Sequence, residues 1–150
     1  MIDIEIMQDA SEIIHYDSPE ISYAVQERLL SNYTDMRALC HWHDDVELLY
    51  IFDGEMNYDV NGRHYLFKKG DTIFINSRQL HYGYDHDQHE CEFMVLLIHP
   101  ELLKASNYMY RRYVLPILNY ATDIVIIENN SPSGACLLYT SDAADDLIGV

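Results

Sequence analysis

Histidine and glutamate side chains recur at a regular spacing between His41 and Glu47. Successive side chains of an extended strand point to opposite faces, so His41, His43 and Glu47 would share one face, whereas Trp42 would point to the other. Imidazole nitrogens and a carboxylate can bind a metal ion or hydrogen-bond a polar ligand. The spacing therefore predicts that three chemically active side chains converge on one surface.

The region that must position these side chains, residues 39–99, has the pattern of antiparallel β structure. Apolar residues recur mostly with a period of two, and turn signals are spaced roughly 8 to 13 residues apart, as in a β-sandwich or barrel. The dipeptide Asn61-Gly62 suits a two-residue type I′ turn. We expect it to join Met56–Val60 and Arg63–Phe67 in a hairpin.

The residues from Pro100 to Tyr120 change to helical spacing, with Pro100 in the first turn and an interruption at Pro116. We expect one or two helices docked on the β structure, followed by a strand over Asp123–Glu128. The apolar side chains available for packing are those of Leu102, Leu103, Met109, Tyr113 and Leu118.

Composition sets the class of protein. The chain has 150 residues, 49% of them apolar, and a formal net charge of -16, which suits one globular domain and disfavours nucleic-acid binding by this chain alone. No apolar run is long enough for a membrane span, and the N-terminus has no signal-peptide pattern. Three widely spaced cysteines suit reduced thiols. We expect a cytoplasmic protein without membrane partners.

Two sequence motifs resemble those of the cupins. His41, His43, Glu47 and Gly54 match His-x-His-x3-Glu-x6-Gly, and Gly70 and His81 match the second motif, which here carries Asn76 and Arg78 in place of proline and glycine. The resemblance implies a mainly β fold, a double-stranded β-helix or jelly-roll-like barrel, followed here by the helices. It also implies that the matched histidines and glutamate surround its cavity.

Two interpretations of His41, His43, Glu47 and His81 remain open. They could bind Mn, Fe, Ni or Zn, or they could be free of any metal or cofactor and either hydrogen-bond a polar effector in a pocket or only hydrogen-bond one another inside the barrel. Tyrosine is abundant, and its flat apolar face and hydroxyl group suit a sugar ring. We therefore expect these residues and neighbouring tyrosines to bind a small polar effector, with a saccharide as the first candidate. That set comprises His41, His43, Glu47, Tyr50, His81 and Tyr82.

A longer set of segments is similar to the N-terminal domain of AraC/XylS-type transcriptional regulators. It includes residues 40–55, 68–71, 76–81 and Leu97–Leu103. The resemblance implies an effector-sensing domain without enzyme activity and favours the metal-free pocket. It also implies a homodimer in the full-length regulator and DNA binding through helix-turn-helix units that this chain lacks. The alternative is a stand-alone metal-dependent cupin enzyme, a dioxygenase or isomerase.

The segment Cys136–Asp146 resembles the translation of a transposase adapter used in sequencing libraries, although a polar helix capped by Ser141 is also possible. We expect this tail to be adapter-derived and the gene to continue past Ala135. The expected organisation is an N-terminal arm with strands (1–38), the cupin effector-binding barrel (39–100), a helical segment (101–121), a strand and loop (122–135) and the tail (136–150).

Overall fold

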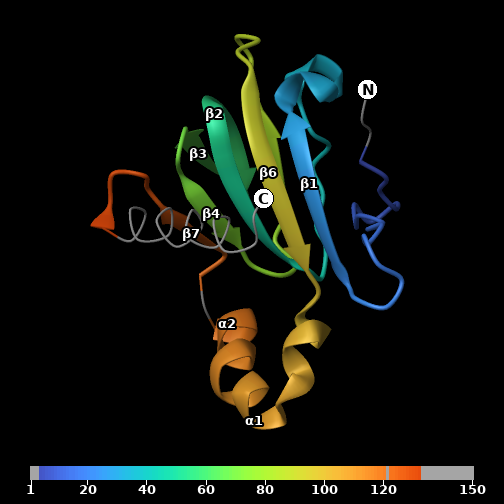
Figure 1. Ribbon diagram of the computed structural model, residues 1–150. Coiled ribbons are helices and arrows are strands. Elements are labelled where there is room, and N and C mark those ends of the chain that lie inside the picture. Colours follow the sequence, from blue (N-terminus) through green and yellow to red (C-terminus); the bar gives the residue numbers. More distant parts are fainter. Residues whose placement is uncertain (1–3, 121, 133–150) are drawn as a thin grey trace, which may run out of the picture.

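The computed structural model describes residues 4–120 and 122–132 (Figure 1). The expected adapter-derived tail therefore lies outside the described residues. The strands are β1 (Tyr23–Leu29), β2 (Val46–Val60), β3 (Arg63–Lys68), β4 (Thr72–Ile75), β5 (His81–Tyr84), β6 (Cys91–Ile98) and β7 (Ile124–Ile127). The α-helical segments are α1 (Asn107–Met109) and α2 (Leu115–Tyr120).

The expected mainly β, cupin-type architecture is confirmed, and β2 belongs to both of its sheets. Hydrogen-bonded neighbours follow the order β1-β6-β2-β4-β7 in one sheet, and β3 and β5 flank the second half of β2 in the other. All pairs are antiparallel. Because β1 pairs with β6, the sheet begins at Tyr23 rather than at the expected residue 39.

The register of β2 against β6 shifts between Ile51 and Asp53. Such a bulge inverts the inward and outward alternation of a strand, so Leu49 and Ile51 are buried before it and Met56 after it. Gly54 follows with a φ of +80°, and a Cβ atom there would collide with the backbone oxygen of Glu90. The final glycine of the first motif is thus required by this bend of the chain.

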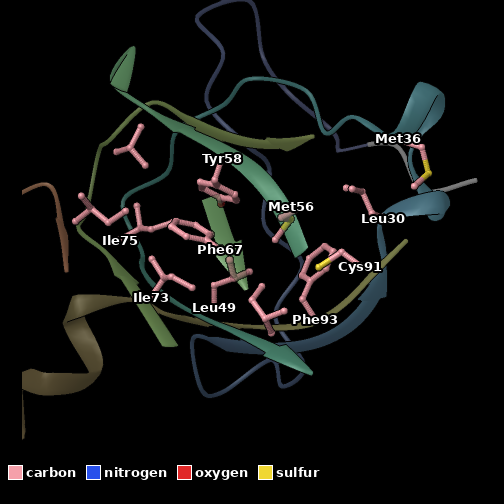
Figure 2. Close-up of a cluster of buried hydrophobic side chains, with 13 residues drawn as sticks. Leu30, Met36, Leu49, Met56, Tyr58, Phe67, Ile73, Ile75, Cys91 and Phe93 are labelled. Carbon is pink, nitrogen blue, oxygen red and sulfur yellow. The ribbon is translucent and has the colours of Figure 1, made fainter. Parts of the chain in front are cut away.

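The hairpin expected at Asn61-Gly62 is confirmed. β2 pairs with β3 from Val60 opposite Arg63 onward, and the two turn residues have φ angles of 52° and 79°, as a type I′ turn requires. The strands carry inward side chains into a closely packed interior between the two sheets (Figure 2). Its members include Leu30, Leu49, Ile51, Met56, Tyr58, Val60, Phe67, Ile73, Ile75, Cys91 and Phe93.

The helical region begins with a 3-10 segment, Pro100–Ala105, and continues from α1 through a π-helical stretch, Tyr110–Val114, into α2. Helical structure thus continues through Pro116, and the widened π turn directly before it gives the proline ring room that a regular helix lacks. The side chains expected to pack on the barrel remain largely exposed, among them Leu103 (42%), Met109 (50%) and Tyr113 (53%).

No helix among the described residues is both long and apolar enough to cross a membrane.

Candidate functional site

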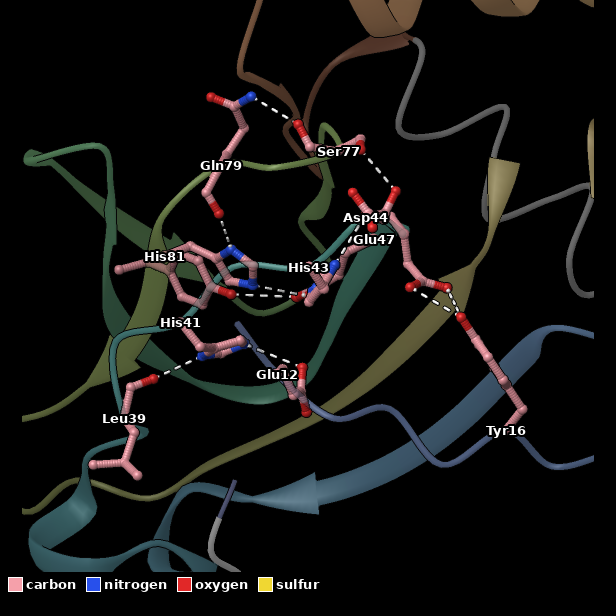
Figure 3. Close-up of polar contacts among 12 residues, drawn as sticks. Glu12, Tyr16, Leu39, His41, His43, Asp44, Glu47, Ser77, Gln79 and His81 are labelled. Carbon is pink, nitrogen blue, oxygen red and sulfur yellow. Dashed lines mark hydrogen bonds and ion pairs between the residues drawn. The ribbon is translucent and has the colours of Figure 1, made fainter. Parts of the chain in front are cut away.

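The structure brings His41, His43, Glu47 and His81 together at one end of the barrel interior (Figure 3). Their exposed fractions are 6%, 3%, 3% and 1%. One ring nitrogen from each histidine lies within 4.8 Å of the others. Residues 41–43 lead into β2, which carries Glu47, and β5 starts with His81. Motif matching thus identified all four members of this cluster.

Each imidazole is oriented by a backbone carbonyl two residues away in the sequence. His41 Nδ1 lies 2.6 Å from the oxygen of Leu39, and His81 Nδ1 lies 2.8 Å from that of Gln79. His43 Nδ1 lies 2.9 Å from the oxygen of Asp45. A carbonyl oxygen only accepts hydrogen bonds, so each Nδ1 must carry the hydrogen. In its neutral form, each ring therefore presents an Nε2 lone pair.

Glu47 contacts two of the three imidazoles. Its Oε2 is 3.2 Å from His43 Nε2 and 3.1 Å from His81 Nε2, and its Oε1 accepts a 3.2 Å hydrogen bond from the Tyr58 hydroxyl. Because both Nδ1 atoms are already protonated, a close contact between Nε2 and the carboxylate requires an imidazolium or a cation bound by both groups. The centre is therefore suited to positive charge.

Burial and charge act against each other on the pKa values of the cluster. Burial raises the pKa of Glu47, but the charge of His81 and hydrogen bonds from His43 and His81 outweigh it, so the pKa lies well below its ordinary value. Burial lowers the pKa of His43, but its hydrogen bond and attraction to Glu47 produce a net rise. Burial, reinforced by His81, lowers the pKa of His41 to about 3, so this imidazole is neutral near pH 7.

Glu12 is a fifth polar member of the site that the sequence did not indicate. Its Oε2 lies 3.5 Å from His41 Nε2, and its side chain is 16% exposed. Burial raises its pKa, against the charges of His43 and His81. Glu12 lies in the first part of the expected segment 1–38, within residues 4–17, which are called the N-terminal arm below; apart from the alternation of Ile4 and Ile6, this stretch has no clear periodicity.

A cavity of about 290 Å³ opens beside the cluster. Its polar lining includes Glu12, His41 and Glu47, with the tyrosines Tyr33 and Tyr58. Burial, with the charge of Glu47 next, raises the pKa of Tyr58 well above its ordinary value, so its hydroxyl stays protonated. The apolar lining includes Ile13, Leu30, Leu49, Met56, Phe93, Val95 and Leu97.

Tyr50 and Tyr82, expected to bind the ligand, do not line this cavity. Tyr50 directly follows the buried Leu49, and Tyr82 directly follows the buried His81. Because side chains alternate along a strand, both tyrosines lie on the outer face. Tyr50 makes an edge contact with Phe52 at 5.1 Å between ring centroids. The Tyr82 hydroxyl donates to Asp59 Oδ2 at 2.9 Å.

The two departures from the second motif have structural roles. Arg78 has a left-handed φ of 64°, the conformation that glycine adopts most readily, and its Nε donates to Asp44 Oδ1 at 2.6 Å. Asn76 Nδ2 donates to the backbone oxygen of Ile117 at 2.8 Å. The segment before His81 is thereby attached both to the first motif and to α2.

The geometry fits a divalent transition metal as one possible occupant. The cluster offers up to three imidazole nitrogens and the Glu47 carboxylate, a donor set used for Mn, Fe, Ni and Zn. Histidine ligands of metals almost always donate their other ring N–H to a carbonyl, carboxylate or water, as the three Nδ1 contacts do here. The same groups can hydrogen-bond a polar organic ligand.

Comparison with known proteins gives matches of three kinds. The profile described as "AraC-like ligand binding domain" matches residues 24–114. The uncharacterized HTH-type transcriptional regulator YdeC of Bacillus subtilis (strain 168) is 25% identical over 113 residues, 75% of this chain, and the match spans 38% of that regulator's length.

Among solved structures, the plu4264 protein of Photorhabdus luminescens has a TM-score of 0.49 and 15% identity over 73% of this chain and 89% of its own. A Cupin 2 conserved barrel domain protein of Salinispora arenicola CNS-205 has a TM-score of 0.49 and 10% identity over 75% of this chain and 99% of its own.

Proposed function

Because the chain belongs to the AraC-like ligand-binding domain family, we propose that it is the effector-sensing domain of an AraC-type transcriptional regulator. A small polar molecule binds in the barrel cavity and is released unchanged. The observation that carries this proposal is the cavity of about 290 Å³, in which buried histidine and carboxylate groups face an apolar wall. A few convergent polar groups in an otherwise apolar cavity are typical of small-molecule sites.

A saccharide is the effector class proposed first. Glu12, Glu47 and the Tyr58 hydroxyl can exchange hydrogen bonds with several hydroxyl groups, and the ring of Phe93 offers an apolar surface. Tyr33 and Tyr58 take the place that the sequence suggested for Tyr50 and Tyr82.

Thermal unfolding of the purified chain with a panel of mono- and disaccharides tests this proposal. A ligand present at about 100 times its Kd adds about 2.7 kcal/mol to the free energy of unfolding and raises Tm. Chromatography of each stabilising sugar after incubation should recover it unchanged. Stabilisation by no member of the panel would contradict the saccharide, and conversion to a product would contradict the sensing role.

DNA recognition is proposed to reside in a part of the regulator outside this chain. The net charge of -16 opposes phosphate binding, and the match spans only 38% of the helix-turn-helix regulator. The exposed apolar residues Leu103, Met109 and Tyr113 support a helical contact between two subunits of the full regulator. In a mobility-shift experiment with the upstream DNA of its own gene, the full-length product should bind as a dimer, whereas this chain should not bind.

A metal-dependent cupin enzyme, such as a dioxygenase or isomerase, is the second candidate. The observation that favours it is the set of three Nδ1 contacts that direct the Nε2 atoms to one centre. His41, His43, Glu47 and His81 would hold the ion, which would supply Lewis-acid or oxygen-activating chemistry. Metal analysis of protein purified without an affinity tag, followed by turnover assays on the loaded protein, tests this candidate.

A further inference from the structure

We propose that Glu12 is an additional ligand of a divalent transition metal ion held by the cluster of His41, His43, Glu47 and His81, so that the ion fastens the N-terminal arm to the barrel. This inference goes beyond effector sensing, because it assigns to the arm a direct part in forming the site. It rests on the fit of the donor set to a metal and is independent of the effector's identity.

The arm is held against the motif that carries two of the histidines. Glu12 N donates to the oxygen of Trp42 at 2.9 Å, and Trp42 N donates to the oxygen of Ala10 at 3.1 Å. The Trp42 indole also donates to the oxygen of Asp9 at 2.9 Å. Because Trp42 lies between His41 and His43 in the sequence, these contacts place the arm beside both imidazoles.

The Glu12 carboxylate enters the site from this position. Its Oε2 is 3.5 Å from His41 Nε2, and its charge interacts with those of His43, Glu47 and His81. With metal–nitrogen bonds of about 2.1 Å, neighbouring ligand atoms of a tetrahedral ion are about 3.4 Å apart. The contacts of 3.5, 3.2 and 3.1 Å between carboxylate oxygens and Nε2 atoms are of this size.

The hydrogen-bonding state of His41 also favours a cation between this imidazole and Glu12. His41 donates its Nδ1 hydrogen to Leu39, so the neutral ring presents an Nε2 lone pair to the carboxylate oxygen. When Glu12 is ionised, both atoms are acceptors. A metal ion bound by both turns this unfavourable pair into two coordinate bonds. Among the described residues, the ligand atoms of the three histidines lie within 4.8 Å of one another, so both carboxylates would have to move towards an ion held by these nitrogens.

If Glu12 binds the ion, metal binding and the placement of the arm are thermodynamically linked. Occupancy should protect the arm from local opening, and removal of the ion should release it. The arm residues Glu12 and Ile13 line the effector cavity, so the linkage would also control access to that cavity.

Cobalt(II) titration of the untagged, EDTA-treated 150-residue chain tests this inference. Calorimetry should give one ion per chain, and Glu12→Gln should weaken binding about 10- to 100-fold, the range seen when groups that support a metal site are removed. The visible absorption of cobalt should intensify in this variant, because the coordination number falls. Glu5→Gln is the matched control, since Glu5 is on the same arm and lines the same cavity but is 63% exposed.

Hydrogen exchange provides the second measurement. Cobalt should slow exchange at the Glu12 amide in the wild-type chain but not in Glu12→Gln, and Glu12→Asp should restore part of the protection. Circular dichroism before titration checks that each variant is folded. Absence of stoichiometric cobalt binding would overturn the inference, and so would equal affinity and equal arm protection in the wild type and Glu12→Gln.

Discussion

The main chains of His41 and His81 form a reciprocal pair of hydrogen bonds. The His41 amide donates to the oxygen of His81 at 3.2 Å, and the His81 amide donates to the oxygen of His41 at 2.9 Å. Their ring centroids are 4.4 Å apart. Backbone pairing thus sets the spacing of these two imidazoles, and a substitution of either ring should leave the other in place.

Replacing Glu47 with leucine should strongly destabilise the fold. The carboxylate contacts both His43 and His81 in a buried site, and removing one partner of such a pair typically costs about 3–5 kcal/mol. Urea unfolding of Glu47→Leu should show a loss of about 3 kcal/mol or more. The exposed Glu55 on the same strand provides the control, and Glu55→Leu should change stability by less than about 0.5 kcal/mol. Equal losses in both variants would contradict the assigned role.

Substitutions at two glycines with nearly equal φ angles can distinguish the cost of a left-handed backbone from the cost of a steric collision. Gly54 and Gly62 have φ of +80° and +79°, but only at Gly54 would a Cβ atom meet the backbone of Glu90, whereas nothing lies within 4 Å at Gly62. Gly62→Ala should therefore cost about 1–2 kcal/mol. Gly54→Ala should cost at least about 1 kcal/mol more, since neighbouring backbone must move. Thermal unfolding of the two variants measures the difference, and equal Tm values would show that Gly54 tolerates a Cβ atom.

The tyrosines differ in their expected effect on effector binding. Tyr58 lines the cavity and donates to Glu47, whereas Tyr50 lies outside the cavity. For any effector found by thermal shift, Tyr58→Phe should raise Kd about fivefold or more, the effect of losing roughly 1 kcal/mol of hydrogen bonding. Tyr50→Phe should leave Kd unchanged. Calorimetric titration of each variant with the effector measures the two Kd values. Weaker binding in Tyr50→Phe alone would show that the effector binds outside this cavity.

The two described cysteines should differ in reactivity. Cys40 is exposed, whereas Cys91 is fully buried, and burial raises the pKa of the Cys91 thiol to about 12. Alkylation requires the thiolate, so iodoacetamide at pH 8 should modify Cys40 and spare Cys91. Peptide mass spectrometry of the native and urea-unfolded protein checks this. Early labelling of Cys91 in the native protein would contradict its burial.

Sequence reasoning predicted the fold and the four-residue cluster because both depend on local, regular patterns. Alternation placed Glu47 on the inward face, and the motif spacing supplied His81. The same alternation could not find Tyr58, because the bulge between Ile51 and Asp53 inverts the inward face of β2 and the sequence does not mark it.

Two further features of the site, the strand β1 and the residue Glu12, are not indicated by the sequence for physical reasons. The sequence pattern does not indicate β1 as part of the barrel, because Gln26 and Arg28, which line the cavity, are polar, so its inner face lacks an apolar pattern. Glu12 reaches the site through contacts of the arm with Trp42, which no short-range spacing encodes.

The segment from Asn76 to His81 joins two parts of the molecule, α2 and the histidine cluster. At one end Asn76 holds the backbone of α2 through Ile117, and at the other His81 contacts Glu47. A displacement of either end would act on a span of six residues, and the left-handed φ of Arg78 lies in its middle. The segment therefore ties the position of His81 to that of the exposed Ile117 through the chain itself.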